Sequence, residues 1–317
     1  MLKNKIKYFE NFVLNYSPFT WEIKDYDDRP LFKDKHSFLL SYRRFFKVFS
    51  YIVDLKEKLS TKVKILDVGS YPGNMIKLSS KLFEKQLAEY TAIGLSFDKE
   101  FVEGVRKYNA KCINSEIDPA FPFSKQVSDW GISNYDLAYL LDTIEHLVEP
   151  NFCLDQINIS LKKNGYLIIT TDNITNFLYI QDMLRKGKSP NVPFVLSSKV
   201  YTGDWRPHNR EYSKEELYYL LEYSGFEIIK HEFFDRKQAE FKINTKKNRI
   251  IDHKIKWGLK HGVFLAAKYL AYCIPHLRNH HILLAKKVKE INEIGEIRKK
   301  TNSVEEWLKI RKLRGNI

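Results

Sequence analysis

The middle of the chain alternates between strand patterns and helix patterns, and this alternation limits the possible folds more than any other feature. Short apolar runs read as strands at VKILDV (63–68), YTAIGL (90–95), AKCIN (110–114), YDLAYLL (135–141) and YLIITT (166–171). Helical spacing of apolar residues follows the first two runs, at 76–87 and 98–108. Strands separated by helices predict an α/β fold with a parallel sheet that helices cover on both faces.

Four further elements complete the predicted architecture. A helix is expected to begin near Pro150 and to end at 162–165, because Lys and Asn-Gly favour a helix carboxyl terminus. An aromatic-rich amphipathic helix at 36–59 is expected to cap the sheet or to cover a substrate cleft. Segments 226–234 and 280–287 are expected to pair as antiparallel strands at the sheet edge, which makes the basic stretch between them an insertion.

Length and cysteine usage indicate the general class of protein. A chain of 317 residues with 44% hydrophobic content can bury a full core, either as one large domain with additions or as two small domains. The cysteines Cys112, Cys153 and Cys273 match neither a zinc spacing nor a disulfide framework. We therefore expect a reducing compartment and a cytoplasmic protein.

No secretory signal or membrane span is expected. The segment MLKNKIKYFENF at 1–12 lacks the apolar core of a signal peptide. The longest apolar candidate, 257–274, is interrupted by Lys260, His261 and Lys268, and no run reaches the roughly 18 apolar residues of a membrane span. A helix that lies on a membrane surface remains one reading of this segment.

Positive charge is concentrated in the carboxyl-terminal part of the chain. The formal net charge is +14, and residues 237–280 hold ten Lys or Arg against two Asp or Glu. Residues 286–317 hold ten against five. This excess indicates either a solvated basic face or a docking surface for an anionic partner such as nucleic acid, a phospholipid headgroup or a phosphorylated sugar carrier.

The first strand runs into a glycine-bearing turn, GSYPG. Asp67 closes the strand, while Gly69 and Gly73 allow the backbone to turn tightly before a helix whose free NH groups face the cleft. In an open parallel sheet, ligands bind beyond the carboxyl ends of the strands. A ligand-binding turn and a plain strand-to-helix connection are both compatible with this short pattern.

The order of several motifs then favours one family. DVGSYPG, AIGLSFDKEF, NSEIDPAFPF, YDLAYLLDTIEHL and LKKNGYLIITTDN resemble the successive motifs of class I S-adenosylmethionine-dependent methyltransferases over about residues 60–236. Within them, DPAFPF, EHL, TTDN and HNREY are similar to the type 11 and type 12-like branch, which is often linked to glycan, cell-surface or lipid-linked acceptors. The resemblance implies a Rossmann-like fold with a mostly parallel seven-stranded sheet, helices on both faces, and helical additions at both ends.

The resemblance also implies where the methyl donor binds. Asp67 and the backbone from Gly69 to Gly73 would hold its aminoacid end, and Leu141 would line the same pocket. Two positions depart from the family pattern, because Tyr71 replaces the middle glycine and Ser96 replaces the acid that grips the ribose.

The ribose and adenine contacts are less sharply defined. Asp98 could replace the missing acid beside Ser96, or it could simply cap the following helix. Glu116 or Asp118 would reach the adenine amino group, with solvation of the loop as the alternative.

The stretch LLDTIEHL places polar groups beside the transferred methyl. His146 could act as a general base for an acceptor hydroxyl. Alternatively, Asp142, Glu145, His146 and the later His208 resemble the divalent-metal ligands of small-RNA 2′-O-methyltransferases, which suggests Mg²⁺ or Mn²⁺. A third reading is that Glu145 and His146 merely orient the loop. Arg210 could bind an acceptor phosphate or carboxylate, or pair with a neighbouring glutamate.

Three functions are therefore considered. The first is O-methylation of a sugar, glycolipid or related small acceptor; the second is metal-dependent RNA 2′-O-methylation; the third is a non-catalytic protein that keeps the fold. We expect a helical cap at 1–60, a methyltransferase domain at 61–287 with a basic insertion at 237–280, and a basic helix or tail at 288–317. The insertion could bring this cytoplasmic protein to an anionic membrane surface.

Overall fold

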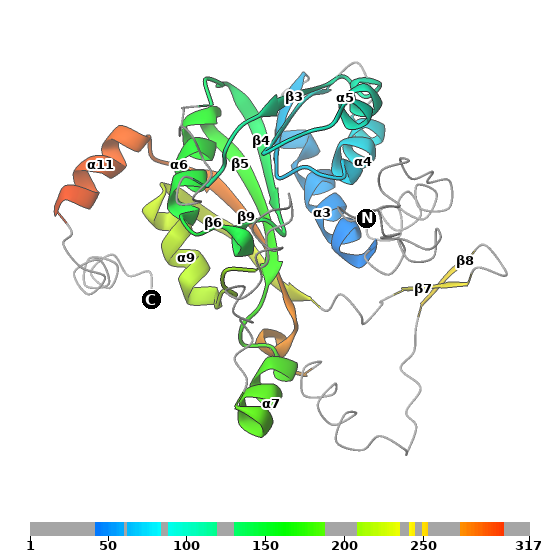
Figure 1. The fold of residues 1–317 in the computed structure, drawn as a ribbon, viewed down its shortest axis with the longest axis vertical. Helices are drawn as coiled ribbons and strands as arrows, with labels where there is room; N and C mark the ends of the chain where they lie inside the picture. The colour runs from blue at the N-terminus through cyan, green and yellow to red at the C-terminus, as the bar shows by residue number, and fades with distance from the viewer. Residues whose placement is uncertain are drawn as a thin grey trace.

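A seven-stranded sheet forms the centre of the molecule in the computed structural model (Figure 1), which describes residues 42–59, 62–83, 88–118, 130–187, 208–234, 241–244, 249–252 and 273–300. The strands are β1 (Val63–Val68), β2 (Ala88–Gly94), β3 (Ala110–Asn114), β4 (Tyr135–Leu141), β5 (Leu161–Asp172), β6 (Phe226–Phe234) and β9 (His280–Lys287). Their spatial order is β3-β2-β1-β4-β5-β9-β6. Among these seven, β9 alone runs in the direction opposite to the other strands. The expected mostly parallel sheet is confirmed.

The strand order reverses between β1 and β4. The chain steps outward from β1 through β2 to β3 and then returns to pair β4 with the other side of β1. In this pairing Asp67 lies opposite Tyr139, so the carboxyl ends of both strands meet at one edge of the sheet. In open parallel sheets, ligands bind at the edge where the strand order reverses in this way.

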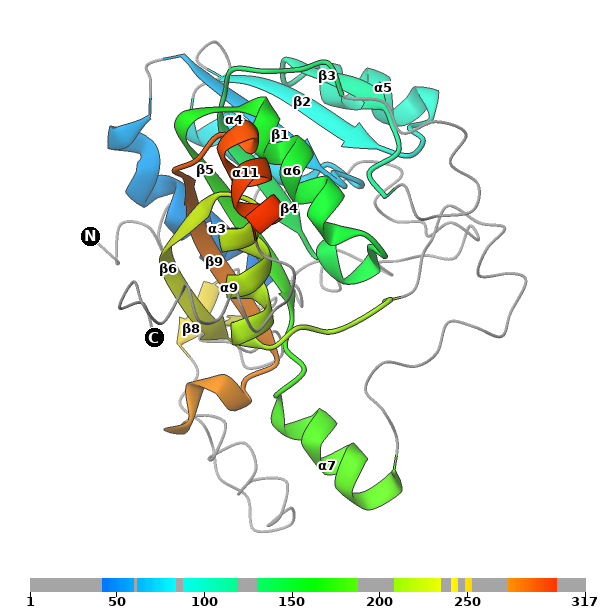
Figure 2. The same ribbon diagram turned by 90° about the vertical axis from the view of Figure 1, so that its left-hand side faces the viewer.

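Helices cover both faces of the sheet, as Figures 1 and 2 show. One apolar cluster joins the sheet to α3 (Tyr42–Leu55), α4 (Asn74–Leu82) and α5 (Lys99–Arg106). The other joins it to α6 (Pro150–Ser160) and α9 (Lys214–Tyr223). The remaining helices are η2 (Lys56–Lys58), η3 (Ile144–His146), α7 (Phe177–Lys186), η6 (Pro275–Leu277) and α11 (Ile291–Lys300).

The helix expected at 36–59 is described as α3, which continues into the single 3₁₀ turn of η2. Phe45, Phe49 and Ile52 are spaced at three and four residues and are all buried. The charged Arg44 and Lys47 of the same helix reach toward strand ends, at Asp142 and Glu232 respectively. The helix therefore packs on the sheet and also contributes polar groups to its carboxyl edge.

The prediction that the helix after Pro150 runs to 162–165 is wrong, because α6 ends at Ser160 and β5 begins at Leu161. Leu161 pairs with Tyr135 of β4 before the register shifts. A lysine that is distant in the sequence binds the backbone carbonyls at the end of this helix, instead of the adjacent lysines. Lys287 Nζ lies 2.8 Å from the Asn158 carbonyl oxygen and 2.9 Å from the Leu161 carbonyl oxygen.

The antiparallel pair expected from 226–234 and 280–287 is confirmed as β6 and β9. Between them, β7 (Phe241–Asn244) and β8 (Arg249–Asp252) form a separate two-stranded sheet. The predicted surface-lying segment 257–274 lies almost entirely outside the described residues, as do 1–41 and 301–317. Among the described residues, no helix is both long and apolar enough to cross a membrane.

Candidate functional site

The turn after β1 presents buried polar atoms that have no hydrogen-bond partner. Asp67 is 3% exposed, and neither its Oδ2 atom nor the Ser70 hydroxyl oxygen meets a partner within the described part of the chain. Burial raises the pKa of the Asp67 carboxyl to about 7. Beside them α4 begins at Asn74 without a side-chain cap. A ligand with an ammonium and a carboxylate, such as the aminoacid end of the methyl donor, matches this set of groups.

Both glycines of the turn have left-handed backbone angles, with φ of 69° at Gly69 and 87° at Gly73. A Cβ atom at Gly69 would come within 2.5 Å of the Thr143 hydroxyl oxygen. This turn at 69–73, called the donor turn after its predicted ligand, therefore packs directly against the loop that follows β4, and only glycine fits at position 69.

One of the two departures from the family pattern, Ser96, lies just beyond the carboxyl end of β2. Ser96 is exposed, and Asp98 caps α5 by accepting a 2.7 Å hydrogen bond from the Phe101 NH group. The capping alternative for Asp98 is thus confirmed, while ribose binding by Ser96 and Asp98 stays a prediction. Between them, Phe97 stacks on Phe101 with ring centroids 4.5 Å apart.

The two candidates for the adenine contact differ in their surroundings. Asp118 is fully buried, and its carboxylate accepts hydrogen bonds from the NH groups of Val148, at 2.8 Å, and Glu149, at 3.1 Å. Glu116 is half-buried and accepts from the NH groups that follow it. Asp118 therefore holds the loop after η3, and Glu116 is the better candidate for the donor.

At the end of β4, Leu141 packs against the core cluster on the α3 face. Asp142 is in neither of the groups of possible metal ligands that the described residues form, so its predicted place in the metal set is wrong. The Asp142 carboxylate pairs with Arg44 and accepts a 2.6 Å hydrogen bond from the Thr170 hydroxyl. His280 Nε2 lies 3.3 Å from the same carboxylate. The structure thus assigns Asp142 to a buried ionic cluster.

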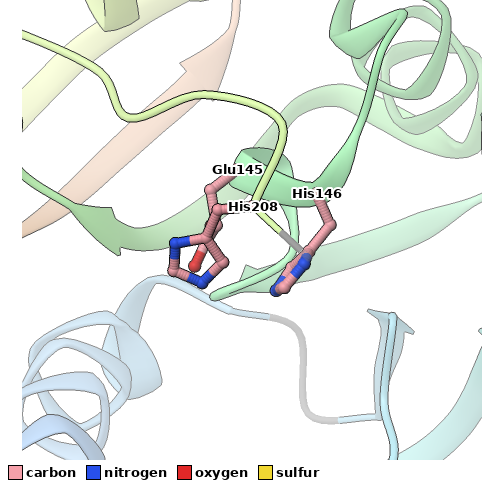
Figure 3. A group of neighbouring side chains, drawn as sticks. All are labelled: Glu145, His146 and His208. Carbon is pink, nitrogen blue, oxygen red and sulfur yellow. The ribbon is translucent and has the colours of Figure 1, made fainter. Parts of the chain in front are cut away.

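The other three members of the predicted set do come together (Figure 3). Glu145, His146 and His208 each offer a ligand atom, and these atoms lie within 4.8 Å of one another. The two imidazole rings meet edge to face, with centroids 4.7 Å apart. Glu145 is 1% exposed and accepts a 2.8 Å hydrogen bond from the Thr171 hydroxyl. Burial raises the pKa of its carboxyl to about 7.

His208 is surrounded by carboxylates. Its Nδ1 atom lies 2.7 Å from Glu211 and 3.7 Å from Asp172. Burial alone lowers the pKa of the imidazole, but the Glu211 hydrogen bond and the charges of Glu145, Glu211 and Asp172 together raise it to about 9. His208 is therefore a cation at neutral pH.

The loop that carries His208 is fixed at both sides. The Glu145 carbonyl accepts hydrogen bonds from the NH groups of Asn209, at 2.6 Å, and Arg210, at 3.2 Å. Ser213 and Glu216 then form a capping box at the start of α9. Arg210 pairs with Glu216 and lies over the Tyr212 ring, so the glutamate-pairing alternative is confirmed for this residue.

Four site residues were missed by the sequence reasoning: Arg44, Asp172, Glu211 and His280. Asp172 and Glu211 stand inside the motifs TTDN and HNREY, so their acidic side chains were a usable signal. Arg44 and His280 lie 98 and 138 residues from their common partner Asp142, and no local pattern reveals such pairs. Chemically, the site offers imidazole and carboxyl groups that can accept a proton, beside a turn suited to a zwitterionic ligand.

Comparisons with known proteins identify the family of the chain. A sequence model of the methyltransferase domain matches residues 40–231. The chain is similar to a solved S-adenosylmethionine-dependent methyltransferase from Archaeoglobus fulgidus, with 16% identity, a TM-score of 0.42 and coverage of 74% of this chain and 92% of that chain. It is also similar to one from Methanosarcina mazei, with 15% identity, a TM-score of 0.41 and coverage of 74% and 97%. The curated proteins contain no match.

The matched segment spans more than half of the chain and includes the donor turn and the loop after β4. The chain therefore belongs to the methyltransferase domain family, and it is an S-adenosylmethionine-dependent methyltransferase with a Rossmann-like class I fold.

Proposed function

We propose that this enzyme methylates a hydroxyl oxygen of a sugar, glycolipid or related small acceptor. The observation that carries the proposal is the pairing of His146 with the His208–Glu211 dyad, beyond the carboxyl end of β4. S-adenosylmethionine supplies a methyl group activated by a sulfonium, so the acceptor oxygen needs mainly position and a base.

Each group in the pairing has a distinct part in the proposal. His146 is half-buried and takes the hydroxyl proton as the oxygen reacts. His208, held as a cation by Glu211 and its neighbours, donates a hydrogen bond to the acceptor. Arg210 contributes at the exposed rim, where an anionic group of the acceptor would compete with Glu216 for its guanidinium.

Charge supports a lipid-linked or phosphorylated acceptor over a neutral one. The insertion 237–280 carries a strong excess of Lys and Arg, and anionic headgroups attract such segments by roughly 1 kcal/mol per cation near the surface. We therefore propose a cytoplasmic enzyme that contacts an anionic membrane surface through this insertion.

The test is transfer of labelled methyl from S-adenosylmethionine into a crude extract that is then separated into RNA, glycolipid and small-molecule fractions. Label in the glycolipid or sugar fraction supports the proposal, and the His146→Ala variant should lose that label. Label confined to ribonuclease-sensitive material would reject it.

A second candidate, metal-dependent RNA 2′-O-methylation, rests on the clustering of Glu145, His146 and His208. Asp172 and Glu211 form a second group of the same size with His208, and these carboxylate and imidazole groups could bind Mg²⁺ or Mn²⁺ once His208 loses its proton. A bound metal ion would lower the pKa of an acceptor hydroxyl. Activity lost with EDTA and restored by Mn²⁺ favours this candidate, whereas activity that is indifferent to chelator excludes it.

A further inference from the structure

A buried histidine joins the carboxylates at the ends of β4 and β5. His280 begins β9 and is 0% exposed. Its Nδ1 atom lies 2.6 Å from Asp172 Oδ1, and its Nε2 atom lies 3.3 Å from Asp142 Oδ1. The Asn279 carbonyl also lies 3.1 Å from Nδ1, a longer contact than that of Asp172. Ionised carboxylates only accept hydrogen bonds, so an imidazole ring that carries a proton on both nitrogens can hold both of them in place.

The two carboxylates differ in how many other groups hold them. Asp142 is also bound by Arg44 and by the Thr170 hydroxyl. For Asp172, the groups that lower the pKa of its carboxyl against burial are His280 first, followed by His208 and Arg44. His280 is the largest of these influences and lies within hydrogen-bond distance of Asp172. The position of the Asp172 carboxylate therefore depends on His280 more than the position of the Asp142 carboxylate does.

Asp172 in turn faces the proposed reaction site. Its Oδ2 atom lies 3.7 Å from His208 Nδ1, on the same side of the ring as Glu211. The strand that ends at Asp172 and the strand that begins at His280 pair with each other, with Asp172 opposite His280. The backbone register therefore sets the distance between these two side chains.

We infer that His280 is a positioning residue, which holds the Asp172 carboxylate so that His208 keeps its orientation toward the acceptor. This inference rests on the proposed function for the role of His208, although the geometric part of it does not. His280 is not proposed to touch the donor or the acceptor. It acts through Asp172, from a strand more than 100 residues further along the chain.

The two ring nitrogens can be tested separately with amide isosteres. Asn places its side-chain NH₂ group near the position of Nδ1, whereas Gln places it near Nε2. His280→Asn should therefore keep the hydrogen bond to Asp172, and His280→Gln should keep the one to Asp142. A histidine with a purely structural role would give the same result for both variants.

The first readout is the crystal structure of each variant, which requires no acceptor. We expect the separation of Asp172 and His208 to be kept in His280→Asn and lost in His280→Gln. The second readout is kinetic. His280→Gln should lose turnover by roughly 10- to 100-fold, the effect of a misplaced catalytic group, with the donor dissociation constant unchanged. His280→Asn should lose much less.

His231→Gln is the matched control, because His231 contacts the next residue along β9, His281, and lies outside the proposed machinery. It should leave turnover unchanged. If the His280 variants do not fold, Asp172→Asn and Asp142→Asn test whether Asp172 is the carboxylate that matters for His208. We expect the larger loss of turnover from Asp172→Asn, and equal losses would overturn the inference.

The outcomes separate the inference from the proposed function. Equal separations of Asp172 and His208 in both His280 variants, or equal turnover losses, overturn the role of His280. If the separation of Asp172 and His208 changes as expected but the protein methylates only RNA, the positioning role of His280 is supported. The proposal of a sugar or glycolipid acceptor is then overturned.

Discussion

Gly69 and Thr143 lie in contact across the carboxyl edge of the sheet, so close that a Cβ atom on Gly69 would stand 2.5 Å from the Thr143 Oγ1 atom and 2.8 Å from its Cγ2 atom. One residue belongs to the donor turn and the other to the loop that leads to Glu145 and His146. The turn after β1 and the loop after β4 are therefore held together by a contact between the Gly69 backbone and the Thr143 side chain.

We expect Gly69→Ala to destabilise the protein by roughly 2–4 kcal/mol, from the strain of a positive φ combined with the clash. Thr143→Ala removes both the hydroxyl and the methyl group from the contact. In that background Gly69→Ala should cost clearly less, and urea unfolding of the four proteins measures the coupling. Additive costs would show that the contact with Thr143 is not the cause.

Donor binding should release a proton from Asp67. Because the pKa of this buried carboxyl is about 7 without a partner, most of it is protonated at pH 6, and the donor ammonium favours the ionised form. Calorimetry at pH 6 in buffers of different ionisation enthalpy should show release of up to about one proton, which falls toward zero at pH 9. Asp67→Asn should bind the donor more weakly and release none from this site. Buffer-independent heats would contradict the ionisation of Asp67 on binding.

The same carboxyl predicts a pH dependence of stability. Its pKa is higher in the folded protein than the ordinary value of 3.8. The stabilising contribution is therefore complete below that ordinary value and is lost as the pH rises through about 7. The free energy of unfolding of donor-free protein should fall between pH 4 and pH 7, by on the order of a few kcal/mol, and Asp67→Asn should flatten this part of the curve.

His146→Ala should lower turnover by roughly 10²- to 10⁴-fold, since the variant removes the proposed base, while the dissociation constant of the donor stays near the wild-type value. Steady-state kinetics and calorimetry give the two quantities. His276→Ala is a suitable control, because the His276 side chain is exposed and packs beside Phe233. Turnover that survives His146→Ala would remove His146 from the reaction.

Lys287→Met should destabilise the fold by roughly 2–4 kcal/mol, because the variant leaves the carbonyls of Asn158 and Leu161 buried without their cation. Lys287 is 3% exposed, whereas its neighbour Lys286 is half-buried and serves as the matched control. Thermal unfolding should separate the two variants by several degrees. Equal melting temperatures would mean that water or the adjacent lysines can replace Lys287.

The strands could be predicted because each is a short apolar run between turn residues, and this signal is local. The clustering of Glu145 with His208 could be expected only from the family resemblance, since 62 residues separate them in the sequence. The partners of Asp142 could not be predicted. Of its neighbours, Arg44 lies far before Asp142 in the sequence and His280 lies far after it. Charge pairing over such sequence distances leaves no local pattern.

The end of α6 shows the same limit in another form. Lys162 and Lys163 have the composition of a helix carboxyl terminus, but the strand pairing of Leu161 and the reach of Lys287 together end the helix two residues earlier. The local sequence correctly predicted that a helix ends in this region, but tertiary contacts set the residue at which it ends.

The place of β9 in the sheet has a consequence for how the protein is made. β5 and β6 have no contact with each other in the sheet until β9 enters between them, and β9 follows them in the sequence by more than 40 residues. A nascent chain therefore holds two unsatisfied strand edges until residue 287 has left the ribosome. Truncation before His280 should yield an aggregating product instead of a smaller enzyme, and the closing strand brings its histidine to the site in the same step that completes the sheet.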